Sequence, residues 1–386
     1  MSKYGNVPDP ESFLSTFPDF DFIDVKESSS YLVEELYKEH QSNSLAETFN
    51  VVRKLLLEGK TEEAVNTYKT AYEKLSSGVP LTTIDILKDT SRYEAYAERV
   101  KDFDKFYVKT GFKELDDIIG GWDREEELAT IVARPNVGKS WILLKCALAA
   151  AEQGLAVGIY SGEMSERKVG YRIDTLLEHL SNGALIHGSA SIMNDYKHYI
   201  DNLPNRLKGS IKVLTPNMIN GLAGVTALRA FMEKDKLDIL FIDQHSLLED
   251  DRKAKNPVER ASNISKDLKQ LQVLMRKPII SVSQQNRNST ENGPGTEHVS
   301  QSDRISQDST ILLFIERRKD SNIIDLELVK SRDSENGKKL SYNVDFNKGE
   351  FQYIPGEGDT SSEHYDNSRY ELSSSSPART SGEEVF

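Results

Sequence analysis

The sequence contains very little cysteine: one residue, Cys146, among 386. A single thiol excludes an internal disulfide and a cysteine-based zinc site, so the chain is not a disulfide-stabilised module. Cys146 stands on an apolar helical pattern, which favours core packing over catalysis. Long hydrophobic runs are also missing, because no run approaches the ~18 apolar residues of a membrane span. We therefore expect no membrane partner.

Two further patterns are missing. The first residues contain no charged segment followed by an apolar one, so nothing indicates secretion and we expect a cytoplasmic location. An excess of basic charge is missing as well, since the formal net charge is −13 at pH 7. A protein that coats nucleic acid with its whole surface is unusual at such a charge. Binding through a local basic lining stays open, because a few cations near phosphates supply the affinity.

What the sequence does contain is a phosphate-loop pattern at residues 133–140, ARPNVGKS. It follows an apolar run and opens a helical pattern, and this order of strand, loop and helix is what a phosphate-binding loop needs. Backbone N–H groups of such a loop converge on an anion, and the helix N-terminus adds partial positive charge. Lys139 can reach the β- and γ-phosphates, and the Ser140 hydroxyl can bind Mg²⁺. The candidate nucleotide-binding residues are Ala133, Arg134, Pro135, Asn136, Val137, Gly138, Lys139, Ser140 and Trp141.

Composition divides the chain into four segments. Residues 1–82 predict a small helical domain with a flexible arm, and the apolar spacing over 30–77 predicts three short helices. Residues 83–106 predict a linker helix, and residues 107–355 the main domain. Residues 356–386 are acidic and serine-rich, which is typical of disorder. That tail fits either a partner-binding or a solubilising role.

The main domain alternates β-rich runs with helical patterns. Early alternation predicts parallel strands joined by crossover helices, whereas short turns between the last three runs predict antiparallel strands at one edge. We expect an α/β fold with a central, mostly parallel sheet. The runs are 128–133, 155–161, 211–214, 237–242, 278–283, 310–316, 323–329 and 340–346.

Polar residues stand at or just after the ends of three of these runs. Parallel strands deliver their last residues to the ligand-binding edge of the sheet, so Asp243 can hold Mg²⁺ opposite Ser140. Glu163 would lie beside the γ-phosphate and polarise the attacking water, although an ordinary helix-start role near Ser165 also fits. Gln284 can report γ-phosphate occupancy to the loop that follows it.

Two polar loops follow strands at the same edge. One spans residues 249–263 and carries Arg252 and Lys253, and the other runs from residue 285 to about 309 and carries Arg287. Long loops inside a compact domain are usually functional or disordered. Binding of a nucleic-acid strand and an ordinary solvated surface both fit these residues.

The motifs as a series resemble the DnaB-type hexameric replicative helicases over about residues 107–354. The Ala-Arg-Pro start of the phosphate loop is that family's own form, which explains Ala133 in place of glycine. The resemblance implies a RecA-like P-loop NTPase core, six-membered rings, and NTP-driven movement along single-stranded DNA. The matching motifs are residues 110–116 (TGFKELD), 120–121 (GG), 133–140 (ARPNVGKS), 161–164 (SGEM), 242–243 (ID), 283–287 (SQQNR), 307–308 (QD) and 330–332 (KSR).

The resemblance also implies roles by position. Lys139 and Ser140 would bind ATP or another NTP with Mg²⁺, and Asp243 would be the second-motif aspartate. Glu163 looks like the catalytic glutamate and Gln284 like the γ-phosphate-sensing glutamine. A Lys-x-Arg pair, here Lys330 and Arg332, would enter the neighbouring subunit's site. The candidate DNA-binding residues are Arg252, Lys253, Arg287, Asp303, Arg304, Ile305 and Ser306.

Two departures from the family limit the resemblance. Gln244 follows Asp243 where the family commonly has tyrosine, and the helical region before residue 80 is short. Contacts with a primase or a loader therefore stay open, and the short chain suits a phage or other mobile element. Two other functions remain: a RecA-, RadA- or KaiC-like recombination or clock-type ATPase, and a nucleotide-switched scaffold or loader that unwinds nothing.

Overall fold

The computed structural model describes residue 15 and residues 29–76, 84–284 and 307–356. The chain divides into two units, Met1–Thr90 and Ser91–Phe386, and each is described by itself. Within these described ranges, no helix has both the length and the apolar character that crossing a bilayer requires. The predictions for the N-terminal arm, the loop after residue 284 and the acidic tail from residue 357 fall outside the described ranges, apart from residue 15 in the arm.

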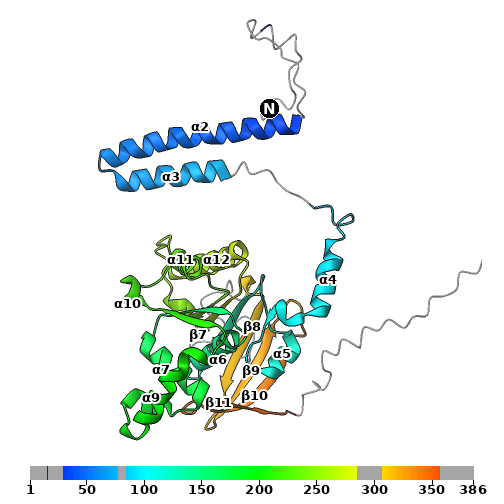
Figure 1. Cartoon of the computed structure of the whole chain (residues 1–386), viewed down its shortest axis with the longest axis vertical. Coiled ribbons are helices and arrows are strands. Elements are labelled where there is room, and N and C mark those ends of the chain that lie inside the picture. Colours follow the sequence, from blue (N-terminus) through cyan, green and yellow to red (C-terminus); the bar gives the residue numbers. More distant parts are fainter. Residues whose placement is uncertain (1–14, 16–28, 77–83, 285–306, 357–386) are drawn as a thin grey trace, which may run out of the picture. The chain divides into compact units, whose positions relative to one another are not determined.

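The first unit contains a helical hairpin formed by α2 (Ser29–Leu57) and α3 (Thr61–Ser76), which lie antiparallel and side by side (Figure 1). Gly59 takes a positive φ of 75° in the turn between them. The prediction of three short helices was wrong, because α2 is one continuous helix of 29 residues. Its sequence has no glycine or proline, and its serines and asparagines cost only about 0.5 kcal/mol each inside a helix.

A short helical region and a small two-stranded sheet open the second unit. In the predicted linker segment, the helix α4 spans only Ser91–Lys101, and residues 86–88 before it form a turn. The 3₁₀ turn η1 (Phe103–Lys105) leads into β1 (Tyr107–Val108), which pairs antiparallel with β2 (Trp122–Asp123) across α5 (Lys113–Ile119).

The main element is a nine-stranded sheet in the order β11-β10-β9-β8-β3-β7-β6-β4-β5. The strands from β3 to β8 are mutually parallel, and β9, β10 and β11 continue the sheet as antiparallel neighbours. The expected α/β fold with antiparallel edge strands is therefore confirmed. Their bounds are β3 (Leu128–Ala133), β4 (Ala156–Ser161), β5 (Ser210–Leu214), β6 (Ile239–Asp243), β7 (Ile279–Gln284), β8 (Ile311–Arg317), β9 (Ile323–Lys330), β10 (Lys338–Asp345) and β11 (Glu350–Ile354).

The last three predicted runs form antiparallel neighbours as expected, and one further strand of the sheet was not predicted. The run at 310–316 forms β8, which is antiparallel to β9 as expected and also pairs parallel with β3. The final strand β11 was not predicted, because its five residues alternate between exposed and half-buried and form no apolar run.

Helices cover both faces of the sheet, and side chains alternate between the two. On β6, Ile239 and Phe241 pack with α6 and α7, whereas Leu240 and Ile242 pack with α11 and α12. Cys146 is buried on α6 in the first of these cores, which confirms its packing role. The helices are α6 (Lys139–Glu152), α7 (Glu166–Glu178), α8 (Asn182–His187), α9 (Met193–Asn202), α10 (Pro216–Ile219), α11 (Val225–Lys234) and α12 (Pro257–Met275), with 3₁₀ turns η2 (Ala190–Ile192), η3 (Leu203–Asn205) and η4 (His245–Leu247).

Candidate functional site

The carboxyl ends of four neighbouring parallel strands meet at one edge of the sheet. The last residue of β3, Ala133, lies opposite Gln284 at the end of β7, and Ser161 at the end of β4 lies opposite Asp243 at the end of β6. The phosphate loop leaves from Ala133, and Glu163 follows Ser161 by two residues. Ligands of open α/β sheets bind at this edge, so the topology itself gathers the phosphate loop, Asp243, Glu163 and Gln284 there.

The phosphate loop connects β3 directly to α6. Gly138 caps α6 with a φ of 101°, which favours glycine, and a Cβ atom there would stand 2.1 Å from the ring of Phe346, which would have to move. No side chain caps the first turn of α6, and its leading N–H groups face the loop. Lys139 and Ser140 begin the helix and are both buried. Together these features form a site suited to an anion.

Asp243 and Ser140 form the part of the site suited to a divalent cation. Asp243 is buried, and neither of its carboxylate oxygens accepts a well-formed hydrogen bond from the described residues. Burial raises the pKa of Asp243, and the nearby Ser140 hydroxyl opposes that rise. A buried carboxylate with unused oxygens beside a hydroxyl provides the hard oxygen ligands that Mg²⁺ prefers. The residues present therefore fit the predicted metal.

Glu163 lies in an exposed turn in front of α7. The turn is closed by Ser161, whose hydroxyl accepts from the Met164 N–H at 3.2 Å and donates to the Met164 carbonyl at 3.0 Å. The helix itself begins at Glu166 with Ser165 as its cap, so the helix-start interpretation of Glu163 does not fit. Glu163 is thus presented at the edge of the sheet, near Asp243.

Arg172 on α7 brings a cation to this pair of carboxylates. Its guanidinium lies 5.1 Å from the ring centroid of Trp141, which in turn stacks on Phe346 at 5.8 Å. Burial lowers the pKa of Arg172, while the charges of Asp243 and Glu163 act to raise it. A guanidinium stacked on an aromatic ring is held in place, so Arg172 supplies fixed positive charge beside both carboxylates.

Lys139 contacts two glutamines: Gln284, which ends β7, and Gln244, which directly follows β6. Its ammonium donates to Oε1 of Gln244 and, at 3.4 Å, to Oε1 of Gln284. The Gln244 amide nitrogen donates to the same Gln284 oxygen at 3.1 Å and to the Ser246 hydroxyl at 2.7 Å. Lys139, Gln244 and Gln284 therefore form one connected group, which we call the lysine–glutamine triad.

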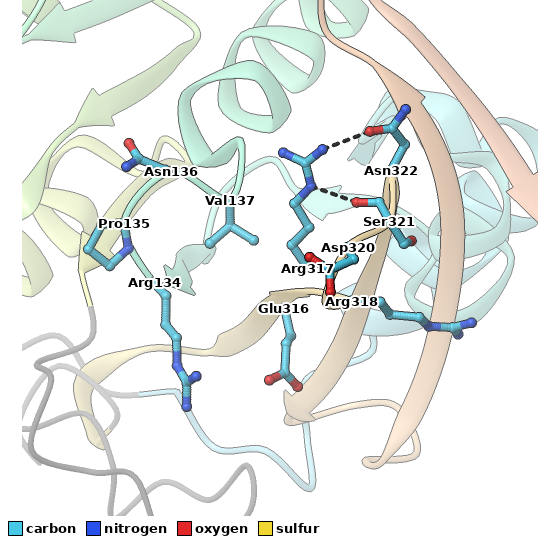
Figure 2. Close-up of a pocket in the computed structure, with 10 residues that line it drawn as sticks. All are labelled: Arg134, Pro135, Asn136, Val137, Glu316, Arg317, Arg318, Asp320, Ser321 and Asn322. Atoms are coloured by element: carbon cyan, nitrogen blue, oxygen red, sulfur yellow. Dashed lines mark hydrogen bonds between the residues drawn. The ribbon is translucent and has the colours of Figure 1, made fainter.

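An open pocket of about 530 Å³ lies beside the phosphate loop (Figure 2). Residues 134–137 of the loop form one wall, and the turn between β8 and β9 forms the other. Arg317 is fixed in that turn by bonds to the Ser321 carbonyl at 2.9 Å and the Asn322 side chain at 2.8 Å. Arg318 instead binds Asp325 of β9. The volume falls within the usual range for a small-molecule site.

Lys330 and Arg332 lie at the opposite edge of the sheet from Lys139. Lys330 pairs with Leu312 near the beginning of β8, and its ammonium donates to the Gln307 carbonyl at 3.1 Å. Arg332 is exposed and lines a small pocket with Glu127 and Thr310, which precede β3 and β8. Burial and the neighbouring Arg332 lower the pKa of Lys330. Within one chain these two cations do not join the other predicted catalytic residues.

The predicted DNA-binding residues are divided between described and undescribed segments. Arg252 and Lys253 lie in the exposed loop between η4 and α12, on the ligand-binding side of β6. Arg252 forms an ion pair with Asp267 of α12, which removes part of its charge from that surface. The other candidates, Arg287, Asp303, Arg304, Ile305 and Ser306, fall outside the described residues.

Sequence reasoning missed three contributors to this site. Gln244 was noted only as a departure from a pattern, and nothing in the sequence indicated its bonds to Lys139 and Gln284. Arg172 and Phe346 come from segments far from any motif. A signal existed for Gln244 alone, since it follows the strand-end carboxylate Asp243 and so lies at the same edge of the sheet.

Comparison with known proteins identifies relatives of this arrangement. The family model described as "DnaB-like helicase C terminal domain" matches residues 107–351. A probable plasmid replicative DNA helicase of Chlamydia psittaci is 30% identical over 255 residues, which cover 65% of this chain and 55% of the relative. The replicative DNA helicase DnaB of Treponema pallidum is 26% identical and covers 62% of this chain and 55% of the relative. The chain thus spans about half the length of the curated relatives it matches.

Solved structures show the same fold. One solved ATPase domain superposes with a TM-score of 0.59 at 21% identity, and the match covers 69% of this chain and 100% of that domain. A DnaB-like replicative helicase, studied with its primase, has a TM-score of 0.59 at 19% identity and covers 86% of this chain and 81% of that one. Both likenesses place the second unit among RecA-like ATPase folds.

Proposed function

The chain belongs to the family of DnaB-like helicase C-terminal domains, and from this we propose that it is a ring-shaped replicative DNA helicase. It hydrolyses ATP or a related NTP, moves along single-stranded DNA and unwinds the duplex ahead. One observation carries the proposal: the phosphate loop, Asp243, Glu163 and Gln284 converge at one edge of the parallel sheet. That set provides the phosphate-binding, metal-binding and water-positioning parts of phosphoryl transfer to water.

The nucleotide would occupy the phosphate loop and the pocket beside it. The first N–H groups of α6 and the Lys139 ammonium bind the phosphates, and the pocket in Figure 2 receives the nucleoside. Ser140 and Asp243 would hold Mg²⁺, which when bound neutralises phosphate charge. Glu163 orients and polarises the attacking water as a general base. The positive charge of Arg172, near Glu163 and Asp243, reduces the electrostatic repulsion between these two carboxylates.

A complete site would need a second subunit. Lys330 and Arg332 lie at the sheet edge opposite their own phosphate loop, which supports the proposal that they enter the site of a neighbouring copy. A cation supplied in this way stabilises charge on the transferred phosphoryl group. A closed ring, with six copies as the family resemblance implies, brings each such edge against the next subunit's phosphate loop.

The proposed partners are single-stranded DNA and other replication proteins. Lys253 and Arg252 supply local positive charge on an acidic chain, and the resemblance adds Arg287 and the residues of 303–306. The DnaB-like helicase described with its primase interactions suggests a primase as a partner for this chain, and a loader is a second. A motor of this kind would act in the cytoplasm of a bacterial or phage-infected cell.

The proposal is tested by measuring ATP hydrolysis by the full chain with and without single-stranded DNA. We expect hydrolysis that rises with DNA and that Lys139→Ala abolishes, because one phosphate-binding cation is lost. Lys145→Ala, on the same helix but directed at Phe112 and Phe351, is the matched control. An equal rate of hydrolysis with and without DNA would favour a nucleotide-switched scaffold. Near-normal turnover of Lys139→Ala would refute the phosphate-loop assignment.

A further inference from the structure

The lysine–glutamine triad has a fixed hydrogen-bond direction. An ammonium group only donates, so the atoms of Gln244 and Gln284 that face Lys139 must be their amide oxygens. Gln244 is 5% exposed, and its amide nitrogen donates to both Gln284 and Ser246. Every polar atom of this side chain therefore has a partner. The oxygen of Gln284 is held inward by two donors, which turns its own amide nitrogen away from Lys139.

The number of N–H donors on Lys139 limits how many acceptors it can bind at the same time. An ammonium group has three N–H donors, and two of them already serve the two glutamines. One further acceptor, such as a single phosphate oxygen, can be added without loss. Two phosphate oxygens, as on the β- and γ-phosphates, require one glutamine to leave. The contact to Gln284 is the longer of the two, and Gln284 is exposed, whereas Gln244 is buried with three partners.

We propose that Gln244 is a positioning residue that makes Gln284 respond to a triphosphate and not to a diphosphate. This inference rests on the proposed function, because it assigns the nucleotide to Lys139. Gln244 keeps its hold on Lys139, so the second phosphate oxygen displaces Gln284. The released amide of Gln284 then turns at the carboxyl end of β7, the edge of the sheet on which the loop with Arg252 and Lys253 also lies. Without Gln244, Lys139 has a donor for each of two phosphate oxygens while it keeps Gln284, so a triphosphate no longer displaces Gln284.

The test compares DNA affinity with two nucleotides. Fluorescence anisotropy of a labelled oligothymidylate gives the dissociation constant of the full chain with ADP and with the non-hydrolysable triphosphate adenosine 5′-(β,γ-imido)triphosphate. We expect the parent to bind DNA about 10-fold more tightly with the triphosphate analogue, a usual size for coupling between two sites. Gln244→Leu should bring the ratio of the two constants close to one, as should Gln284→Ala.

A double mutant distinguishes positioning from general damage. If Gln244 acts through Gln284, the pair Gln244→Leu and Gln284→Ala should lose no more than either change alone. Ser246→Ala is the matched control, because it removes another bond of the same amide while leaving Lys139 and Gln284 in contact with it. That variant should keep the parent's ratio.

Gln244→Glu keeps the shape of the side chain if the leucine variant folds poorly. Its carboxylate cannot donate to Gln284 and attracts Lys139 more strongly, so the KM for ATP should rise about 10-fold while the ratio falls. A parent-like ratio in both Gln244 variants, or additive losses in the double mutant, would overturn this inference alone. A parent with neither hydrolysis nor nucleotide-dependent DNA binding would overturn the proposed function as well.

Discussion

At the scale of single residues, the two carboxylates of the site, Asp243 and Glu163, have different surroundings. Asp243 is buried with unused oxygens, whereas Glu163 is exposed in a turn two residues after the neighbouring strand. A buried carboxylate suits a metal and an exposed one suits contact with water. The two acidic residues are therefore expected to respond differently to the loss of charge.

Glu163→Gln should bind nucleotide normally and turn over about 100-fold more slowly, because an amide cannot act as a general base. Binding of a fluorescent ATP analogue and steady-state hydrolysis measure the two effects separately. Glu166→Gln, in the first turn of α7, is the control and should behave like the parent. Equal loss of binding and turnover in Glu163→Gln would mean that the residue holds the metal.

A second residue gives the protein a pH-dependent stability. Burial raises the pKa of Glu127 to about 7, while a side-chain bond from Thr310 opposes the rise. The pKa in the folded chain lies above the unfolded value of 4.5, so this carboxyl favours folding at low pH and loses that contribution as pH rises from 4.5 through 7. The full change is about 3 kcal/mol.

Glu127→Gln should therefore abolish this part of the pH dependence. We expect the difference in melting temperature between pH 5 and pH 8, followed by circular dichroism, to be smaller in this variant than in the parent. Glu126→Gln changes an exposed neighbour and should leave the difference unaltered. The same pH dependence in the parent and in Glu127→Gln would contradict the assignment.

At the scale of elements, parallel strands explain why so much of the site was predictable. Asp243 and Gln284 end apolar runs, and a parallel sheet aligns such ends whatever the helices between them do. Gln244 and Arg172 were not predictable, because their roles depend on which side chains meet across α6, α7 and the strand ends. Likewise, the uninterrupted α2 was missed because periodicity indicates a helical face without fixing where the helix stops.

The loop between η4 and α12 is the described element most suited to DNA phosphates. Lys253→Ala should weaken affinity for single-stranded DNA and lower the salt slope by about 0.7. Arg252→Ala should have a smaller effect, because Asp267 already pairs with that guanidinium. Lys234→Ala, at the end of α11 and toward the other sheet edge, is the control. Anisotropy across a salt series measures all three, and unchanged slopes would remove this loop from the DNA path.

At the scale of the whole molecule, the proposal requires sites shared between copies. Arg332→Ala and Lys139→Ala should each be inactive alone, yet regain partial hydrolysis when mixed under conditions that let subunits exchange. Mixed rings would contain some sites with Lys139 from one chain and Arg332 from the next. If both variants assemble and mixing restores nothing, the two residues do not act on one nucleotide.

Conversion of NTP hydrolysis into separation of DNA strands is the activity on which the other assignments depend. It is measured as displacement of a fluorescent strand from duplexes that carry a 5′ tail, a 3′ tail or no tail, with ATP and Mg²⁺. We predict displacement that needs both ATP and a single-stranded tail of one polarity and that is lost in Lys139→Ala. Hydrolysis stimulated by DNA without displacement from any tailed duplex would contradict the helicase assignment and favour a recombination-type ATPase.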